Sequence, residues 1–456
     1  MTDFAISRNP TTGEILAKYP MQTASELEQT LDSSAKASKA WRQSSMDMRV
    51  NVLRQLSEQL RQREPELTRM ITLEMGKPVA QARAEILKCA SLCDWYAEFG
   101  PAMLQDQPSQ IPDAWQSFRP IGTILAVMPW NFPFWQVLRG AVGMLLAGNT
   151  YLLKHAPNVM GSAMLMAELF DATDLPEGGF NLINVDNEGV STAIRDDRIA
   201  AVAVTGSVRA GAAIAAQAGA ALKKTVLELG GSDPFIVLAD ADLDEAVKSA
   251  VTGRFQNIGQ VCMAAKRFIV EAPIAEAFEM RFVEAVKALK IGDPLDEQTY
   301  IGPMARYDLR DELDDQVKAS LREGARLVLG GEKIAGQGNY YAPTILSDVT
   351  SDMTAFRQEL FGPVAAIAVA RDADHALEIA NNSEFGLSAT VWTNNTDRAE
   401  QMTANLEVGA VFINGNGASD PRVTIGGVKK SGYGRELSHF GVHEFCNIQT
   451  VWKNRR

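Results

Sequence analysis

The segment Thr123-Ile-Leu-Ala-Val-Met-Pro-Trp-Asn-Phe-Pro133 decides the fold, because an apolar run ends in a stiff turn and a periodic stretch follows. The same alternation continues to Leu229. Apolar runs at 123–128, 150–153, 181–185, 200–204 and 225–229 predict buried strands, and residues 136–147, 161–173 and 208–218 predict the helices between them. Strands separated by helices form a parallel sheet covered on both faces, so we expect an α/β unit that binds ligands beyond the carboxyl ends of its strands.

A helical segment precedes this unit, and a second α/β unit follows it. Apolar residues recur at helical spacing from Ser25 to Phe99, whereas residues 101–120 break the pattern. After Gly230-Gly231, strands are predicted at 235–238, 267–270, 364–370, 389–393 and 410–414. The final run, 447–452, has no predicted strand left beside it, so we expect it to pair with another subunit or with residues 107–119.

The composition is that of a folded, acidic protein. A chain of 456 residues exceeds what one core supports, so two or three structural units are expected. The net charge of −12 argues against nucleic-acid binding, and the basic end Lys453-Asn-Arg-Arg456 is interpreted as a solvated tail. No apolar run reaches membrane-spanning length and the first residues lack a signal-peptide pattern, so we expect a cytoplasmic protein with no membrane partner.

The four cysteines do not form a disulfide framework in a chain of this length. Cys89 and Cys93 share one face of a predicted helix; a metal is conceivable there, but no histidine accompanies them, so we expect buried packing and no metal. Cys446 is also interpreted as structural. Cys262 follows the glycine-containing loop Phe255-Gln-Asn-Ile-Gly-Gln-Val, which can face a cleft. A single cysteine in a loop is usually inert, so partners decide its interpretation.

Two such partners are predicted at strand ends. Glu228, in Thr225-Val-Leu-Glu-Leu-Gly-Gly231, has apolar neighbours that would raise its pKa toward that of a base able to activate water, although it could instead reach solvent. Asn131 lies in a turn stiffened by two prolines and could donate to a developing oxyanion, although asparagine is also an ordinary turn residue. The three residues together favour covalent catalysis.

A dinucleotide site is predicted where Val204-Thr-Gly-Ser-Val-Arg-Ala-Gly211 ends a strand and opens a helix. The free N–H groups of the first helical turn and the helix dipole can meet a pyrophosphate, although a helix merely capped by Ser207 would look the same. Lys154 ends another predicted strand and could reach the adenosine ribose. Glu359 could bind the nicotinamide ribose.

Together these segments resemble the aldehyde dehydrogenase superfamily from about Asn9 to the C-terminus. The resemblance implies an α/β fold with a Rossmann-type dinucleotide-binding domain (1–104 and 121–230), an α/β catalytic domain (231–432) and a β oligomerisation arm (105–120 and 433–456). It also implies homodimers or homotetramers. The motifs that carry it are Pro129-Trp-Asn-Phe-Pro133, Thr205-Gly-Ser207, Glu228-Leu-Gly-Gly231, Gly259-Gln-Val-Cys262, Glu359-Leu-Phe-Gly-Pro363 and Gly426-Gly-Val-Lys-Lys-Ser-Gly432.

The resemblance implies a mechanism. Cys262 attacks the aldehyde, Asn131 and the Cys262 N–H hold the oxyanion, hydride passes to the nicotinamide, and Glu228 activates water to give the free acid rather than a coenzyme A ester. The family often has Pro-x-Glu after the lysine, but this chain has Pro157 in Lys154-His-Ala-Pro157, so we expect both NAD and NADP as cofactors. The implied cofactor-binding residues are Pro129, Trp130, Lys154, Pro157, Thr205, Gly206, Ser207, Leu229, Gly230, Glu359 and Phe361.

The substrate is predicted from the helix after Pro133, where Trp135 and Arg139 lie on one face. Arg139 could pair with the anionic end of a substrate, or it could extend to solvent. Its position resembles that in bacterial succinate-semialdehyde dehydrogenases, which makes succinate semialdehyde the expected substrate. Gln256 replaces a basic residue of other members, and Ala264 replaces a second cysteine, so no redox switch is expected. The predicted substrate-binding residues are Trp135, Arg139, Gln256, Val261, Ser419 and Arg422.

Other functions stay open at this point. The chain could oxidise another short- or medium-chain aldehyde, act as a cysteine hydrolase, or be a binding protein without catalysis. A hydrolase is disfavoured because no histidine lies in a recognisable partner motif. A binding protein is disfavoured because Cys262, Glu228 and Asn131 are all present.

Overall fold

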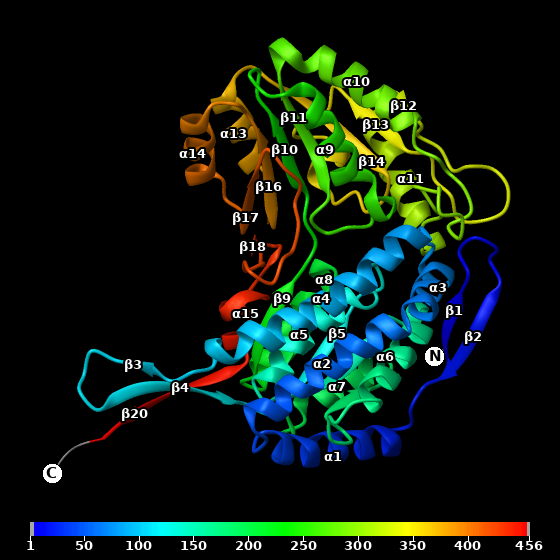
Figure 1. Ribbon diagram of the computed structural model, residues 1–456. Coiled ribbons are helices and arrows are strands. Elements are labelled where there is room, and N and C mark those ends of the chain that lie inside the picture. Colours follow the sequence, from blue (N-terminus) through cyan, green and yellow to red (C-terminus); the bar gives the residue numbers. More distant parts are fainter. Residues whose placement is uncertain (1–3, 454–456) are drawn as a thin grey trace.

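The computed structural model describes residues 4–453. It contains two α/β units stacked on one another, with a narrow arm projecting from one side (Figure 1). Residues up to 230, apart from the arm strands within 107–120, build most of one unit, and residues from 233 to 413 build most of the other. The two units that the alternating pattern predicts are therefore present.

A hairpin and four helices open the chain. Strands β1 (Phe4–Arg8) and β2 (Ile15–Pro20) pair antiparallel. The predicted helical region consists of α1 (Ala24–Trp41), α2 (Met46–Gln62), α3 (Glu64–Met75) and α4 (Val79–Met103). Cys89 and Cys93 lie on α4 and are completely buried in the core formed with α2 and α5, which confirms the expected packing.

The first large sheet has the strand order β19-β9-β8-β5-β6-β7. All neighbours are parallel except β19, which returns from the end of the chain to pair antiparallel with β9. The strands are β5 (Thr123–Met128), β6 (Thr150–His155), β7 (Phe180–Leu182), β8 (Ile199–Thr205), β9 (Lys224–Glu228) and β19 (Gly432–Tyr433).

Helices cover both faces of this sheet because side chains alternate along each strand. Ile124 and Ala126 face a core that includes α5 (Trp135–Leu146) and α6 (Met160–Asp171), whereas Leu125 faces a core that includes α1, α7 (Asn187–Arg195) and α8 (Val208–Ala220). The predicted doubly wound arrangement is confirmed. The predicted strand 181–185 is only partly right, since β7 ends at Leu182, and α7 follows where no helix was predicted.

The second sheet has the order β12-β13-β14-β11-β10-β16-β17, parallel except at β12. Its strands are β10 (Asp233–Val237), β11 (Ala265–Glu271), β12 (Arg326–Leu329), β13 (Thr344–Ser347), β14 (Val364–Ala370), β16 (Ser388–Trp392) and β17 (Ala410–Ile413). Its helices are α9 (Leu243–Phe255), α10 (Ala275–Lys287), α11 (Tyr307–Arg322), α12 (Thr354–Arg357), α13 (Ala373–Asn381) and α14 (Thr396–Asn405). The five predicted strands are all present.

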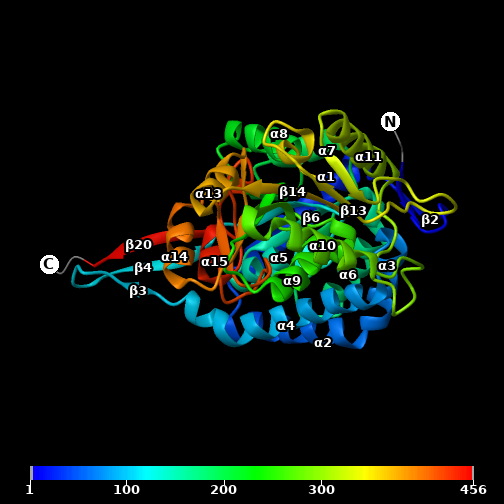
Figure 2. The ribbon, with the colours of Figure 1, turned by 90° about the horizontal axis from the view of Figure 1, so that it is seen from above.

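The arm is a three-stranded antiparallel sheet that extends away from both units (Figure 2). It contains β3 (Gln107–Pro108), β4 (Ala114–Pro120) and β20 (Cys446–Trp452), which follows α15 (Ser438–Glu444). Because β20 pairs with β4 along its whole length, one of the two expected pairings of the C-terminal run is confirmed. The Lys453 ammonium lies 4.9 Å from the centre of the Trp115 ring, and the rest of the predicted tail lies outside the described residues.

Candidate active site

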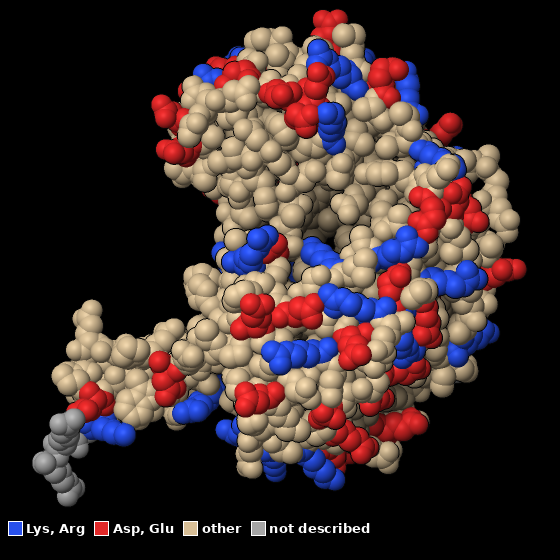
Figure 3. Space-filling view, in the orientation of Figure 1, with Lys and Arg blue, Asp and Glu red and all other residues tan. Residues whose placement is uncertain are grey.

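The surface is hollowed between the two units (Figure 3). Parallel strands β5, β6, β8 and β9 end there, which is where open α/β sheets bind ligands. The cysteine loop comes from the second unit, between α9 and β11.

The loop before Cys262 has an unusual backbone. Asn257 (φ 54°) and Ile258 (φ 56°) both adopt the left-handed conformation, followed by Gly259 (φ 69°). A left-handed conformation strains a β-branched residue such as isoleucine, and each such residue costs on the order of 1–3 kcal/mol. The surrounding structure must therefore hold this loop in place.

Arg254 is one group that holds it. The guanidinium is fully buried, and its Nη2 donates to the carbonyl oxygens of Gly259 (3.1 Å), Leu360 (2.9 Å) and Gly362. A side chain at position 259 would bring its Cβ within 2.3 Å of the Gly362 oxygen, so glycine is required there. Arg254 thus joins the cysteine loop to the segment that follows Glu359.

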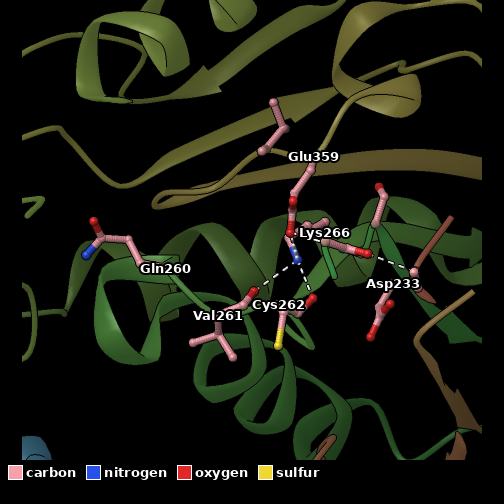
Figure 4. A network of polar contacts seen from close by, with 12 residues as sticks. Asp233, Gln260, Val261, Cys262, Lys266 and Glu359 are labelled. Atoms are coloured by element: carbon pink, nitrogen blue, oxygen red, sulfur yellow. Dashed lines mark hydrogen bonds and ion pairs between the residues drawn. The ribbon is translucent and has the colours of Figure 1, made fainter. Parts of the chain in front are cut away.

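Lys266, on β11, holds the cysteine itself (Figure 4). Its Nζ donates to the carbonyl oxygens of Val261 (2.9 Å) and Cys262 (2.6 Å) and lies 3.3 Å from Oε1 of Glu359. Cys262 turns its carbonyl toward Lys266 and its sulfur to the opposite side. The lysine therefore fixes the direction of the thiol without touching it.

Burial dominates the chemistry of Cys262. It raises the pKa of the thiol to about 11, while the charges of Arg139 and Lys266 act in the opposite direction. The resting thiol is therefore protonated at neutral pH. Attack on a carbonyl requires that its proton leave as the bond forms.

Asn131 is tied to the cysteine loop by two hydrogen bonds. Its Nδ2 donates to the Gln260 carbonyl (3.0 Å), and the Asn257 Nδ2 donates to the Asn131 carbonyl (2.8 Å). The amide nitrogen has a second N–H that can donate to an oxyanion on Cys262.

Glu85 and His155 hold the turn that carries Asn131 in place. Oε1 of Glu85 accepts from the N–H groups of Phe134 (2.9 Å) and Trp135 (3.0 Å) at the start of α5, and Glu85 forms a buried ion pair with Lys77. His155 Nε2 donates to the Pro133 carbonyl (2.9 Å), and burial lowers the pKa of His155 to about 4, so this ring is neutral.

Glu228 ends β9 and is only 3% exposed. Burial raises the pKa of Glu228 to about 8; the Arg139 charge lowers it and the Glu436 carboxylate raises it. The expected shift of this glutamate toward a useful base is therefore present, and its main cause is desolvation.

Arg139 differs from the expectation that it would bind a substrate anion. Its Nε pairs with the carboxylate of Glu436, and its Nη2 lies 4.0 Å from Oε2 of Glu228. Arg139 is 3% exposed, and both carboxylates that its side chain contacts belong to the same chain. Glu436 carried no signal in the sequence because it lies far from the motifs of its partners.

The other predicted substrate residues lie in different surroundings. Trp135 is buried and has the Lys88 ammonium over its ring, and the Ser419 hydroxyl accepts from Lys88 (3.0 Å). Val261 is partly exposed beside Cys262, and Gln256 is exposed. Arg422, proposed to supply a missing charge, is 74% exposed and is held by Asp420 instead.

The predicted cofactor residues fit a dinucleotide. The Thr205 hydroxyl is buried with no hydrogen-bond partner in the described chain, and Gly206 leaves open space where a side chain would be. Ser207 caps α8, and Lys154 ends β6, where burial lowers its pKa. Because the four residues leave an unpaired donor, open space and a helix N-terminus at one sheet edge, a pyrophosphate can be accommodated there.

The remaining cofactor candidates line the border between the two units. A Cβ at Gly230 would come within 2.2 Å of Oε2 of Glu359, and Oε1 of Glu359 accepts from Gly231 N (3.1 Å). The rings of Trp130 and Phe361 meet edge to face at 5.7 Å. Pro129 follows β5, Leu229 follows β9, and Pro157 opens the short helix η1 (Pro157–Val159).

A parallel sheet with a dinucleotide-shaped edge, facing a loop cysteine, a buried carboxylate and a fixed amide, defines the class of nicotinamide-dependent dehydrogenases that act through a covalent cysteine. Residues 3–451 match the model of the aldehyde dehydrogenase family. The chain belongs to the aldehyde dehydrogenase family, and the expected fold and enzyme class, an NAD(P)-dependent aldehyde dehydrogenase, are confirmed.

Similar proteins agree with this assignment. The chain is 64% identical to the succinate semialdehyde dehydrogenase [NAD(P)+] Sad of Escherichia coli (strain K12), over 99% of this chain and 98% of that one. It is 46% identical to a probable succinate-semialdehyde dehydrogenase [NADP(+)] of Synechocystis, over 97% and 98%. The structure of the succinic semialdehyde dehydrogenase from Streptococcus pyogenes in complex with NADP+ matches with a TM-score of 0.97 and 36% identity, over 99% and 100%.

Residues 4–453 contain no cluster of three or more side chains suited to holding a metal ion. In the same range, no helix has both the length and the apolar character needed to cross a membrane.

Proposed function

We propose that this enzyme oxidises succinate semialdehyde to succinate with NAD+ or NADP+. The observation that carries the proposal is the convergence of Cys262, Glu228 and Asn131 beside the dinucleotide edge, in a chain 64% identical to a relative of that name. The free acid is the expected product because Glu228 can activate water.

The chain's own residues account for each proton and charge. The sulfur of Cys262 adds to the aldehyde carbon as the thiol proton passes to the ionised Glu228 carboxylate, which then releases it to solvent, and the charges of Arg139 and Lys266 favour the thiolate that forms. The free N–H of Asn131 donates to the oxygen that becomes negative. A bound nicotinamide dinucleotide supplies the acceptor for the hydride that leaves this carbon.

Glu228 completes the reaction. With its pKa raised to about 8, the carboxylate is a stronger base than an exposed glutamate, yet a useful fraction is ionised near neutral pH. It takes a proton from water, which attacks the thioester carbon, and the bond to sulfur breaks to release the acid and Cys262.

Use of both cofactors is supported at Pro157. This proline starts η1 directly after β6, where relatives often carry a carboxylate that would repel a 2′-phosphate. Lys154, at the end of the same strand, offers a cation on this side. Position 157 therefore contributes no negative charge that would exclude NADP.

The hydrolase alternative requires a histidine base beside Cys262. His155 lies near the site, but its ring is used by Pro133 and by the Ala156 N–H, and its pKa is about 4. A neutral imidazole with both nitrogens engaged does not activate Cys262.

Steady-state rates with succinate semialdehyde and with butanal, each with NAD+ and with NADP+, test the proposal. We expect succinate semialdehyde to give the highest kcat/KM, both cofactors to be reduced, and Cys262→Ala to be inactive. A higher kcat/KM with butanal would reject the substrate, and hydrolysis without cofactor reduction would reject the reaction class.

We also propose a cytoplasmic homodimer or homotetramer built through the arm. Ile448 (52%) and Trp452 (57%) expose apolar side chains on β20, and such exposed apolar surface is usually covered by a partner. Four unpaired cysteines fit a reducing compartment. Sedimentation of Ile448→Asp should give a smaller species than the native chain; an unchanged assembly would exclude this surface.

A further inference from the structure

Lys88 brings an accessible cation to the substrate side of the site. It lies on α4, with its Nζ 3.9 Å from the centre of the Trp135 ring and 3.0 Å from Oγ of Ser419. Part of the Lys88 side chain remains exposed, whereas Arg139 is 3% exposed. Lys88 is therefore the more accessible of the two cations.

The other candidate charges near this place are already compensated. Arg139 pairs with Glu436, and Arg422 pairs with Asp420. Gln256 is uncharged. Among residues 4–453, Lys88 forms no ion pair, and its two close polar contacts are a ring face and a hydroxyl group. Its positive charge is thus available to an anion that enters the site.

The two residues that Lys88 contacts, Trp135 and Ser419, lie in segments next to the Cys262 loop. Trp135, the first residue of α5, follows four residues after Asn131, the amide tied to the cysteine loop. On the other side, the loop of Ser419 passes the cysteine loop, where a Cβ at Gly417 would be 3.4 Å from the Met263 carbonyl oxygen.

We propose that Lys88 and Ser419 bind the distal carboxylate of an ω-oxo acid whose aldehyde carbon is at Cys262. The ammonium has three N–H donors, of which one is used by Ser419, so two can donate to a carboxylate. This inference rests on the proposed function and assigns the residues that select its substrate.

The ionisation of Lys88 suits this role. Burial lowers the pKa of its ammonium to about 8; Arg139 also lowers it, whereas Cys89, Glu85 and Asp420 raise it. The group is mostly charged at neutral pH. Because its ammonium is partly desolvated, it gains more from a carboxylate than a fully hydrated lysine would.

The test compares Lys88→Met and Lys88→Arg in the full-length enzyme, with succinate semialdehyde and with butanal, which has the same chain length but no carboxylate. Arg83→Met is the matched control, since Arg83 lies on the same helix and its ion pair with Glu297 is exposed. We expect Lys88→Met to lower kcat/KM for succinate semialdehyde by roughly 10- to 150-fold, through KM, with little change for butanal. Lys88→Arg and Arg83→Met should both retain the preference for succinate semialdehyde over butanal.

The outcomes separate this inference from the proposed function. If the native enzyme prefers butanal, both fail. If it prefers succinate semialdehyde but Lys88→Met lowers kcat/KM equally for both aldehydes or for neither, only the assignment of Lys88 is overturned. Activity toward butanal also shows whether the variant is folded.

Discussion

Replacing Arg139 by methionine tests the electrostatic centre of the site. Its guanidinium lies between Glu436 and Glu228 with 3% exposure, so Arg139→Met leaves two buried carboxylates without their cation. Breaking a buried ion pair from one side typically costs about 3–5 kcal/mol. We expect a loss of that size in denaturant unfolding, and Arg139→Met combined with Glu436→Gln should regain about 2 kcal/mol because fewer charges stay unpaired.

The kinetic signature of the same variant is a loss without selectivity. Arg139 lowers the pKa values of Cys262 and Glu228, so removing it should raise both. Each unit of such a rise reduces the thiolate fraction about tenfold at a fixed pH. We expect kcat/KM to fall about tenfold or more, by a similar factor for succinate semialdehyde and for butanal. A loss confined to succinate semialdehyde would refute this reasoning and return Arg139 to substrate binding.

Three further variants probe single groups. Glu228→Gln should unfold at a higher temperature than the native chain at pH 8 and above, and this difference should disappear toward pH 4.5. The pKa of Glu228 is about 8 in the folded chain and 4.5 in the unfolded chain, so between these pH values the unfolded chain ionises while the folded chain stays protonated, and the stability of the native protein falls as the pH rises. Equal melting curves at all pH values would argue against a buried carboxylate. Pro157→Glu should raise KM for NADP+ by roughly tenfold or more and spare NAD+, through like-charge repulsion; equal effects on the two cofactors would place the 2′-phosphate elsewhere. Lys266→Met should lower kcat with butanal while KM changes little, because the Val261 and Cys262 carbonyls lose their hydrogen-bond donor. An unchanged kcat would show that the cysteine loop keeps its conformation without Lys266.

Much of the fold could be predicted because its signals are local. The strand 123–128 and the strand 364–370 match their apolar runs residue for residue, since a fully buried parallel strand has little else in its sequence. The helix α7 was not predicted because it has only nine residues and an acidic start, so periodicity is short there. The irregular segment after Leu182 is apolar because it is buried, not because it is a strand.

The sequence predicted a site residue only where that residue lies within a recognisable local motif. Cys262, Glu228 and Asn131 each stand in a recognisable segment, whereas Lys88, Arg254 and Glu436 act through partners that are distant in the chain. Arg139 shows the difference most clearly. Its sequence position suggested a free cation, and only the fold reveals that Glu436 already pairs with it.

Acylation of Cys262 is the most direct test of the account. Glu228→Gln should be mixed with succinate semialdehyde and NAD+, quenched with acid within one turnover, and digested for peptide mass spectrometry. We predict one succinyl group per chain, located on the peptide that contains Cys262 and accompanied by an equal amount of reduced cofactor. Cofactor reduction without a modified Cys262 peptide, or acylation of another residue, would contradict it.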